Sequence, residues 1–247
     1  MTFAARDFDV AARAALFNGV QSPVIARVLA TTRIVRLSKR QVLIRQGERT
    51  PSFFIILDGW IKLYRNVYSG EEAVIDVLTR GSILAMSDAM TGTCFPATAE
   101  AICDVRVLQM RADHMLHWMR TVPQIALNMV VLNSQLHDRL ARQVEVLKTK
   151  SSLQRVAEFL ASLCPTATGP CVVTLPYEKT VIAGRLGMKP ESLSRALAKL
   201  KAVGVQLAAS CVTVRDVRAL HRVCGEETPT GLAMQATARP AANVSGP

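Results

Sequence analysis

The sequence predicts an α+β fold in three parts: a β-rich N-terminal domain, a long central helix, and a mixed C-terminal domain. Short β-rich segments follow one another between Ile34 and Met110, with turn residues between them. Apolar residues at helical spacing come next, and the last part holds two short amphipathic helices joined by a glycine. A chain of 247 residues, 50% of them hydrophobic, has room for two domains with packed cores.

The N-terminal domain is predicted to span residues 1–119 and to be a small β-barrel or roll. Its first thirty residues favour short helices with apolar residues on one side. Beyond them, glycines at positions 47, 59, 70 and 81 recur at intervals of 12, 11 and 11 residues, the length of one strand and one turn. Regularly spaced short strands indicate a barrel or roll. The spacing alone does not distinguish a barrel or roll from a β-sandwich.

A dimerisation helix is predicted over residues 120–148. Its apolar residues are spaced 3, 4, 3, 4, 4, 4 and 3 apart, which is a coiled-coil-like seam with a local irregularity. Because a helix of about four heptads extends beyond a small roll, we expect a homodimer, although the seam could instead pack on its own domain. The seam consists of Val122, Ile125, Met129, Leu132, Leu136, Leu140, Val144 and Leu147.

The C-terminal domain is predicted to span residues 149–224, and residues 225–247, which lack periodicity, are predicted to be a disordered tail. Positive charge is densest in this domain. Residues 149–224 hold eleven Lys and Arg against four Asp and Glu, whereas residues 1–148 hold eighteen against thirteen. This distribution favours a partner that carries phosphates, because basic side chains neutralise a nucleic-acid backbone.

The segment from Glu178 to Val205 carries the strongest functional signal in the chain. Gly187 supplies a tight turn after a first helix, and Pro190 opens a second helix at a first-turn position. Two short helices joined by a glycine turn of three or four residues are typical of a helix-turn-helix. The β-rich runs VQL and VTV after Gly204 predict a hairpin, and CVVTLP upstream predicts a further strand. The sequence therefore predicts a winged helix-turn-helix.

The second helix of this motif presents polar side chains in its first turns, the end that enters the major groove of DNA. Arg195 can donate in a fork to guanine O6 and N7, and Glu191 can accept from a cytosine amine. Ser194 can approach a base or a thymine methyl group. Lys199 and Lys201 lie farther along the helix and are expected to contact phosphates. The predicted DNA-binding residues are Lys189, Glu191, Ser192, Ser194, Arg195, Lys199 and Lys201.

From Leu16 to Val223 the chain resembles the Crp/Fnr superfamily of bacterial transcription regulators. The similarity covers the glycines of the β-rich domain, the stretch GWIKLYRNVYSGEEAVIDVLTRGSIL, the long helix and the winged domain. It implies a cyclic-nucleotide-binding-like jelly roll, a central dimerisation helix, an effector-gated change in affinity for double-stranded DNA, and RNA polymerase as a further partner of an activator. Whether the chain activates or represses transcription stays open.

The segment PESLSRAL makes the resemblance more specific. Its residues Glu191, Ser194 and Arg195 match the E-x-x-S-R pattern of the Fnr-type branch, whose half-sites resemble TTGAT. The preceding Lys189 and Pro190 are similar to the FixK, NnrR and Dnr groups. The resemblance therefore implies binding to a TTGAT-like palindrome.

Two departures from the family pattern bear on the effector. No cysteine precedes Cys94, so the N-terminal ligands of an Fnr-type [4Fe–4S] cluster are missing. Where cyclic-AMP binders carry an Arg-Ser or Arg-Thr pair, this chain has Pro96-Ala97 or Ala97-Thr98, which leaves no cation for a cyclic phosphate. We therefore expect neither cofactor. Haem binding stays an open alternative, because His114 and His117 share a helical face and could act as ligands. An exposed polar face of the helix explains their spacing more simply.

Other classes of protein have little support in the sequence. No G-x-S-x-G, Walker A or H-E-x-x-H motif is present, so neither a catalytic residue nor a metal ligand is predicted, and an enzyme is not expected. No apolar run approaches the ~18 residues of a membrane span, and the start of the chain lacks the apolar core of a signal peptide. We expect a cytoplasmic protein with reduced cysteines. The alternative is a small-molecule-binding dimer whose C-terminal domain contacts protein.

Overall fold

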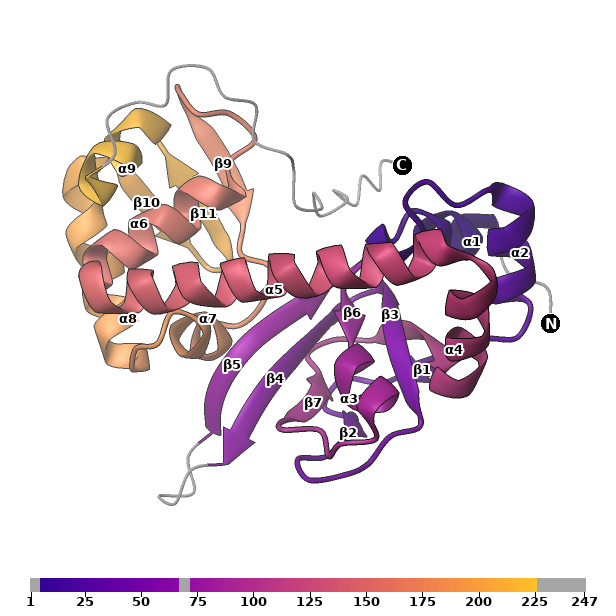
Figure 1. The fold of residues 1–247 in the computed structure, drawn as a ribbon. Helices are drawn as coiled ribbons and strands as arrows, with labels where there is room; N and C mark the ends of the chain where they lie inside the picture. The colour runs from indigo at the N-terminus through magenta and orange to yellow at the C-terminus, as the bar shows by residue number, and fades with distance from the viewer. Residues whose placement is uncertain (1–4, 67–71, 226–247) are drawn as a thin grey trace.

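The computed structural model describes residues 5–66 and 72–225, and within them it confirms the predicted α+β architecture. Figure 1 shows a β-rich N-terminal domain and a smaller C-terminal domain, with one long helix running across both. The predicted disordered tail lies, from residue 226 onward, outside the described residues.

The N-terminal domain is a β-roll of two four-stranded antiparallel sheets. Its strands are β1 (Arg33–Leu37), β2 (Val42–Ile44), β3 (Ser52–Asp58), β4 (Trp60–Asn66), β5 (Glu72–Thr79), β6 (Ile83–Leu84), β7 (Thr98–Ala101) and β8 (Val105–Arg111). One sheet has the order β1-β8-β3-β6 and the other the order β2-β7-β4-β5. Phe54, Ile56, Ile61 and Phe95 belong to the apolar cluster that fills the roll.

The glycine spacing marks turns of the roll, as the sequence predicts. Gly47, Gly59 and Gly81 all have φ between 82° and 87°, a region that side chains with a Cβ disfavour. Gly70 lies outside the described residues. At Gly59 the need is also spatial, because a Cβ would lie 2.5 Å from the Asp104 carbonyl oxygen. Strands form in the β-rich stretch expected between Ile34 and Met110, whereas β6, β7 and the short helix α3 (Met86–Thr91) were not anticipated.

Helices cover the outer face of the sheet that contains β3 and β8. They are α1 (Ala5–Ala12), η1 (Ala15–Phe17), α2 (Ser22–Leu29) and α4 (Ala112–Thr121). Phe53 and Ile55 alternate with the roll-filling residues of β3 and so pack against these helices. Arg106 donates to both carboxylate oxygens of Asp7, at 2.7 and 2.8 Å, and Asp7 is 3% exposed. This ion pair ties α1 to the roll.

The long helix α5 (Pro123–Thr149) has 27 residues and is therefore about 40 Å long. Val122, the first residue of the predicted seam, precedes the helix in a non-helical conformation, with φ −132° and ψ 85°. Pro123 removes a backbone donor, so the helical pattern that begins after the roll is divided between α4 and α5. The Asn128 amide donates to the carbonyls of Leu16 and Asn18, both at 2.8 Å, which anchors α5 to the N-terminal segment.

The C-terminal domain has the predicted winged helix-turn-helix architecture. Its elements are α6 (Ser152–Leu163), β9 (Cys171–Thr174), α7 (Lys179–Arg185), α8 (Pro190–Leu200), η2 (Lys201–Val203), β10 (Val205–Ala208), β11 (Cys211–Val214) and α9 (Val217–Cys224). The three strands form one antiparallel sheet in the order β10-β11-β9. Ser151 and Gln154 form a capping box that starts α6 immediately after α5 ends. The connection between the two domains is therefore short.

Candidate nucleic-acid interface

Helices α7 and α8 form the helix-turn-helix, as predicted. Gly187 lies in the turn with a φ of +62°, and the amide of Met188 donates to the Ala183 carbonyl at 3.0 Å. Pro190 is the first residue of α8, where its missing N–H leaves no helical hydrogen bond unmade. These local constraints set the angle at which α8 leaves α7.

One side of α8 is buried in the C-terminal domain. Leu193, Leu197 and Leu200 are 1–9% exposed and lie in the same cluster as Ile182 of α7. The opposite side, which carries the predicted DNA-binding residues, faces solvent. Ser192 is half-buried, and the exposed members of the set are Lys189, Glu191, Ser194, Arg195, Lys199 and Lys201.

The polar side chains at the start of α8 are free to change partners. Arg195 Nη2 lies 3.5 Å from the Ser192 hydroxyl, a long contact that a base edge could replace. The Ser194 hydroxyl donates to the Pro190 carbonyl at 3.0 Å. Glu191 lies in the first turn, where the positive end of the helix dipole stabilises its carboxylate. The helix therefore offers both a guanidinium donor and a carboxylate acceptor at one end.

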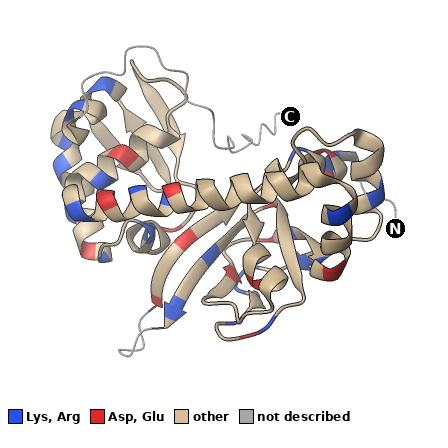
Figure 2. Ribbon diagram, viewed as in Figure 1, with Lys and Arg blue, Asp and Glu red and all other residues tan. Residues whose placement is uncertain are grey.

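Basic side chains lie both before α8 and at its C-terminal end. Figure 2 shows Lys and Arg on several helices of the C-terminal domain, while its sheet carries few charged residues. Lys199 and Lys201 lie at the far end of α8 and its 3₁₀ extension η2, and Lys189 precedes the helix. Their exposed ammonium groups can reach phosphates on either side of a groove that admits α8.

The eight seam residues divide into two groups. The earlier ones, Val122, Ile125, Met129 and Leu132, pack into the cluster beneath the N-terminal helices, and Ile125 is 0% exposed. They therefore cover the protomer's own core. The later ones face solvent: Leu136, Leu140, Val144 and Leu147 are 39–50% exposed.

Three further apolar residues of α5, which lie outside the predicted seam, are exposed. Leu127, Val130 and Val131 are 53–65% exposed in the half of the helix whose seam residues are buried. The local irregularity in the seam spacing is the signal that could have found them, because a break in the repeat moves the apolar stripe around the helix. The solvent-exposed apolar stripe consists of Leu127, Val130, Val131, Leu136, Leu140, Val144 and Leu147.

Arg155 joins the end of α5 to the helix-turn-helix. Its guanidinium donates to the carbonyls of Lys150 at 3.2 Å and of Gly187 at 3.4 Å, while its Nε atom is buried without a hydrogen-bond partner. A Cβ on Gly187 would lie 2.6 Å from Leu147 of α5, so the turn rests directly on the last turn of that helix. A single arginine carries no sequence pattern, and this role was missed.

The segment of the roll that precedes β8 carries no basic residue that could neutralise a cyclic phosphate. Between Arg80 and Arg106 the sequence has no Lys or Arg. Phe95 and Ala97 of this segment are 4% and 3% exposed and belong to the apolar cluster of the roll. The Arg65 Nε atom donates to the Pro96 carbonyl at 2.6 Å, but Arg65 itself is exposed. The residues present do not fit the phosphate of a cyclic nucleotide.

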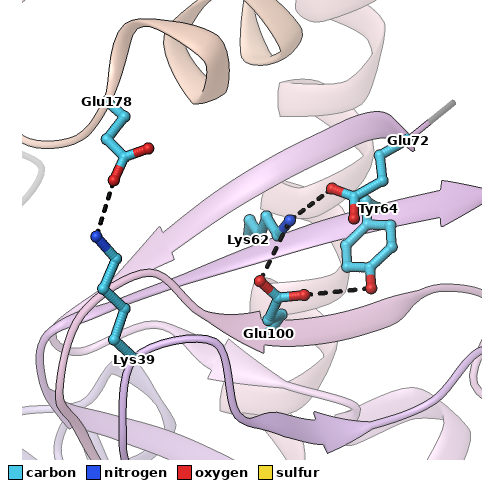
Figure 3. A network of polar contacts seen from close by, with 6 residues as sticks. All are labelled: Lys39, Lys62, Tyr64, Glu72, Glu100 and Glu178. Carbon is cyan, nitrogen blue, oxygen red and sulfur yellow. Dashed lines mark hydrogen bonds and ion pairs between the residues drawn. The ribbon is translucent and has the colours of Figure 1, made fainter.

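A polar network lies across β4, β5 and β7 (Figure 3). The Lys62 ammonium contacts the carboxylates of Glu72, at 2.5 Å, and Glu100, at 3.3 Å, and Tyr64 donates to Glu100 at 3.3 Å. Burial alone would lower the pKa of Lys62, but its hydrogen bond with Glu72 and the charge of Glu100 outweigh burial and raise it. This lysine is held by two carboxylates and is not available to an anion.

The other candidate ligands do not form a metal site among the described residues. His114 and His117 are exposed on α4, and the His117 ring packs edge-on against Trp118. No group of three or more His, Cys, Asp or Glu that could hold a metal was found in the part of the chain described. Burial raises the pKa of the Cys164 thiol, beside Cys171, to about 12, so little reactive thiolate forms at neutral pH. Within residues 5–66 and 72–225, no helix is long and apolar enough to cross a membrane.

Known proteins resemble both domains. Residues 34–122 match the cyclic nucleotide-binding domain family, and residues 154–223 match the Crp-like helix-turn-helix domain family. A solved structure from Ruegeria pomeroyi, described as a candidate cyclic nucleotide binding protein, is 34% identical with a TM-score of 0.64. The match covers 90% of this chain and 98% of that one.

Two curated relatives are more distant. The CRP-like cAMP-activated global transcriptional regulator of Mycobacterium tuberculosis is 24% identical over 87% of this chain and 98% of its own. The nitrogen fixation regulation protein FixK of Rhizobium meliloti is also 24% identical, over 71% of this chain and 75% of its own. With both domains matched in order, an exposed recognition helix, and relatives that span nearly the whole chain, the protein belongs to the Crp/Fnr family of DNA-binding transcription regulators.

Proposed function

We propose that the chain acts as a homodimer that binds a TTGAT-like palindrome through one α8 helix from each protomer. The observation that carries the proposal is the combination of an exposed polar end on α8 with an exposed apolar stripe on α5. The turn at Gly187 packs on Leu147, so the two surfaces are connected through direct contacts. The proposed domain boundaries are 1–119, 120–148 and 149–224.

Dimerisation follows from the exposed apolar stripe. The seven residues of the stripe are 39–65% exposed in the single protomer, more apolar surface than one helix of a soluble monomer commonly leaves uncovered. Pairing with α5 of a second copy about a two-fold axis would bury this surface on both protomers at once. In the proposed dimer the two recognition helices lie about one DNA turn apart, roughly 34 Å, which is the separation that a palindrome requires.

In this arrangement Arg195 and Glu191 read bases. Arg195 donates to guanine O6 and N7, and Glu191 accepts from the amine of a cytosine. Ser192 and Ser194 lie in the same turns and approach the neighbouring base or a thymine methyl group. The exposed lysines Lys189, Lys199 and Lys201 contact phosphates and supply the salt-dependent part of the affinity.

The β-roll is proposed to sense something other than a cyclic nucleotide. The absence of basic residues between Arg80 and Arg106 supports this proposal, because a buried phosphate needs a charged or backbone donor of suitable geometry. Calorimetric titration with cyclic AMP tests it, and saturable binding would overturn it. RNA polymerase is proposed as the partner that the DNA-bound dimer contacts at a promoter.

Fluorescence anisotropy with a labelled TTGAT palindrome and a scrambled duplex tests the proposed function. One bidentate contact discriminates by about 1–3 kcal/mol, and a dimer makes two, so Arg195→Ala is expected to weaken specific binding at least about thirty-fold. Lys199→Ala is expected to weaken both duplexes and to reduce the salt dependence. Arg218→Ala, an exposed arginine of α9, serves as the matched control.

Two outcomes of this experiment would contradict the proposal. Equal losses on both duplexes with Arg195→Ala would remove base readout from this residue. Equal, weak binding of the unmodified protein to both duplexes would instead favour a C-terminal domain that contacts a protein partner.

A further inference from the structure

The core of the C-terminal domain continues onto the outer face of the β-roll. Val77 of β5 is 5% exposed and belongs to the same buried cluster as Ile182 and Ala183 of α7. Trp60 of β4, Val74 of β5 and Ile102 pack against that cluster as well. The docking platform is defined here as Trp60, Val74, Val77 and Ile102.

Helix α7 approaches the platform very closely. A Cβ on Gly184 would lie 2.7 Å from Val74 Cγ2 and 2.9 Å from Val74 Cβ. Gly184 lies inside a helix, where glycine is the poorest ordinary residue, so the helix itself gives no reason for it. The close approach to β5 does give a reason, since no larger residue fits there without moving the domains apart.

Aromatic and charged contacts extend the same interface. The rings of Trp60 and Tyr177 meet edge to face, with centroids 5.3 Å apart. The Tyr177 hydroxyl accepts from Arg185 of α7 at 2.5 Å. Lys39 of the roll contacts Glu178, the residue that precedes α7, at 2.8 Å (Figure 3). Trp60 and Lys39 therefore attach the residues that precede α7 to the roll, and the close approach of Gly184 to Val74 does so near the end of that helix.

The docked arrangement leaves the polar side of α8 exposed to solvent. Glu191, Ser194 and Arg195 remain exposed on α8 while α7 is docked. Undocking would expose the apolar platform to water and leave the C-terminal domain attached mainly through the short connection after α5. Because α7 packs directly on α8, whatever fixes α7 against the roll also fixes the direction of α8.

We propose that this platform positions the helix-turn-helix in the orientation that binds DNA, which makes Trp60 and Gly184 positioning residues for DNA recognition. The inference rests on the proposed function, because it concerns the orientation of the same α8. Through this roll surface a change in β4 or β5 would reach α7, and through α7 the recognition helix α8, although Trp60 and Gly184 are 124 residues apart in the sequence.

The test is Gly184→Ala in the full chain. Alanine favours the helix by about 1 kcal/mol, so α7 should persist while the new methyl group pushes against Val74. We expect unchanged far-ultraviolet circular dichroism and an unchanged oligomeric state, with specific DNA affinity at least tenfold weaker. Trp60→Ala removes the roll's side of the contact and is expected to weaken affinity in the same direction. Val74→Gly combined with Gly184→Ala removes the clashing atoms and is expected to restore affinity toward that of Val74→Gly alone.

A second readout follows docking without DNA. The chain has two tryptophans, so in a Trp118→Phe background the emission reports Trp60. Gly184→Ala is expected to shift this emission to longer wavelength and to increase its quenching by iodide. If Gly184→Ala leaves both the Trp60 emission and the DNA affinity unchanged, the proposal is overturned. A gain in DNA affinity would also overturn it, because docking would then be inhibitory. If the unmodified protein binds no palindrome, the proposed function fails, and the Trp60 emission still decides whether the docking exists.

Discussion

Val144→Ala tests the exposed stripe of α5 with the least disturbance to the protomer. Val144 is 50% exposed, so about half of its side chain is available to a partner. The substitution removes two carbon atoms, each of which contributes about 0.8 kcal/mol when fully buried. At half burial, and counted on both protomers of a symmetric dimer, the loss is about 1.6 kcal/mol. A dimer that uses this surface should dissociate about fifteen-fold more readily.

Sedimentation equilibrium over a range of concentrations measures this change. Val172→Ala is the matched control, because Val172 is 66% exposed and belongs to β9, not to α5. It should leave the dissociation constant unchanged. Alanine is the better helix former, so a weaker dimer cannot be ascribed to a melted α5. Equal dissociation constants for Val144→Ala and the unmodified chain would refute the assignment of this stripe to the dimer interface.

Three further outcomes concern the fold that holds the site. Gly59→Ala places a Cβ 2.5 Å from the Asp104 carbonyl in a left-handed conformation, so chemical denaturation should show a loss of several kcal/mol, and full retention of stability would contradict it. Asn128→Ala leaves two carbonyls without their amide donor and should lower the unfolding free energy by about 2–4 kcal/mol, and an unchanged value would contradict the anchoring role of Asn128. The hydrogen bond from Arg111 lowers the pKa of Asp113 to about 2. A carboxylate whose pKa is lower in the folded state stabilises the fold at pH values above its unfolded pKa. This contribution is lost as the pH falls toward 2. Arg111→Ala should therefore raise the Asp113 pKa toward 3.8, as followed by NMR titration, and an unmoved pKa would exclude the pair.

Strands and helices were predictable where the pattern is strong. The glycine spacing identified turns at Gly47, Gly59 and Gly81, and the two helices around Gly187 appear where the sequence predicts them. The two-residue strand β6 was not predictable, because a run that short has no period to detect. Strand β7, with the sequence TAEA, has one β-branched residue and no aromatic residue, while Ala and Glu are depleted in strands, and its position is set by pairing with β2 and β4.

The site was predictable in part, and for similar reasons. The polar face of α8 follows from helical spacing alone, since the buried positions Leu193, Leu197 and Leu200 fix what remains exposed. Spacing could not tell which apolar side of α5 its own domain covers, because that depends on the N-terminal helices packed against Ile125. The contact between Gly184 and β5 joins residues more than a hundred positions apart and has no local signature.

The most direct test of the account is the dependence of affinity on the spacing between the two half-sites. Two α8 helices held by paired α5 helices should bind a TTGAT palindrome whose half-sites are centred one helical turn apart, about 10 base pairs. Insertion of 5 base pairs rotates one half-site to the opposite side of the duplex, and we expect specific binding to fall to the level of scrambled DNA. Equal affinity for both spacings would contradict a dimer that reads both half-sites at a fixed separation.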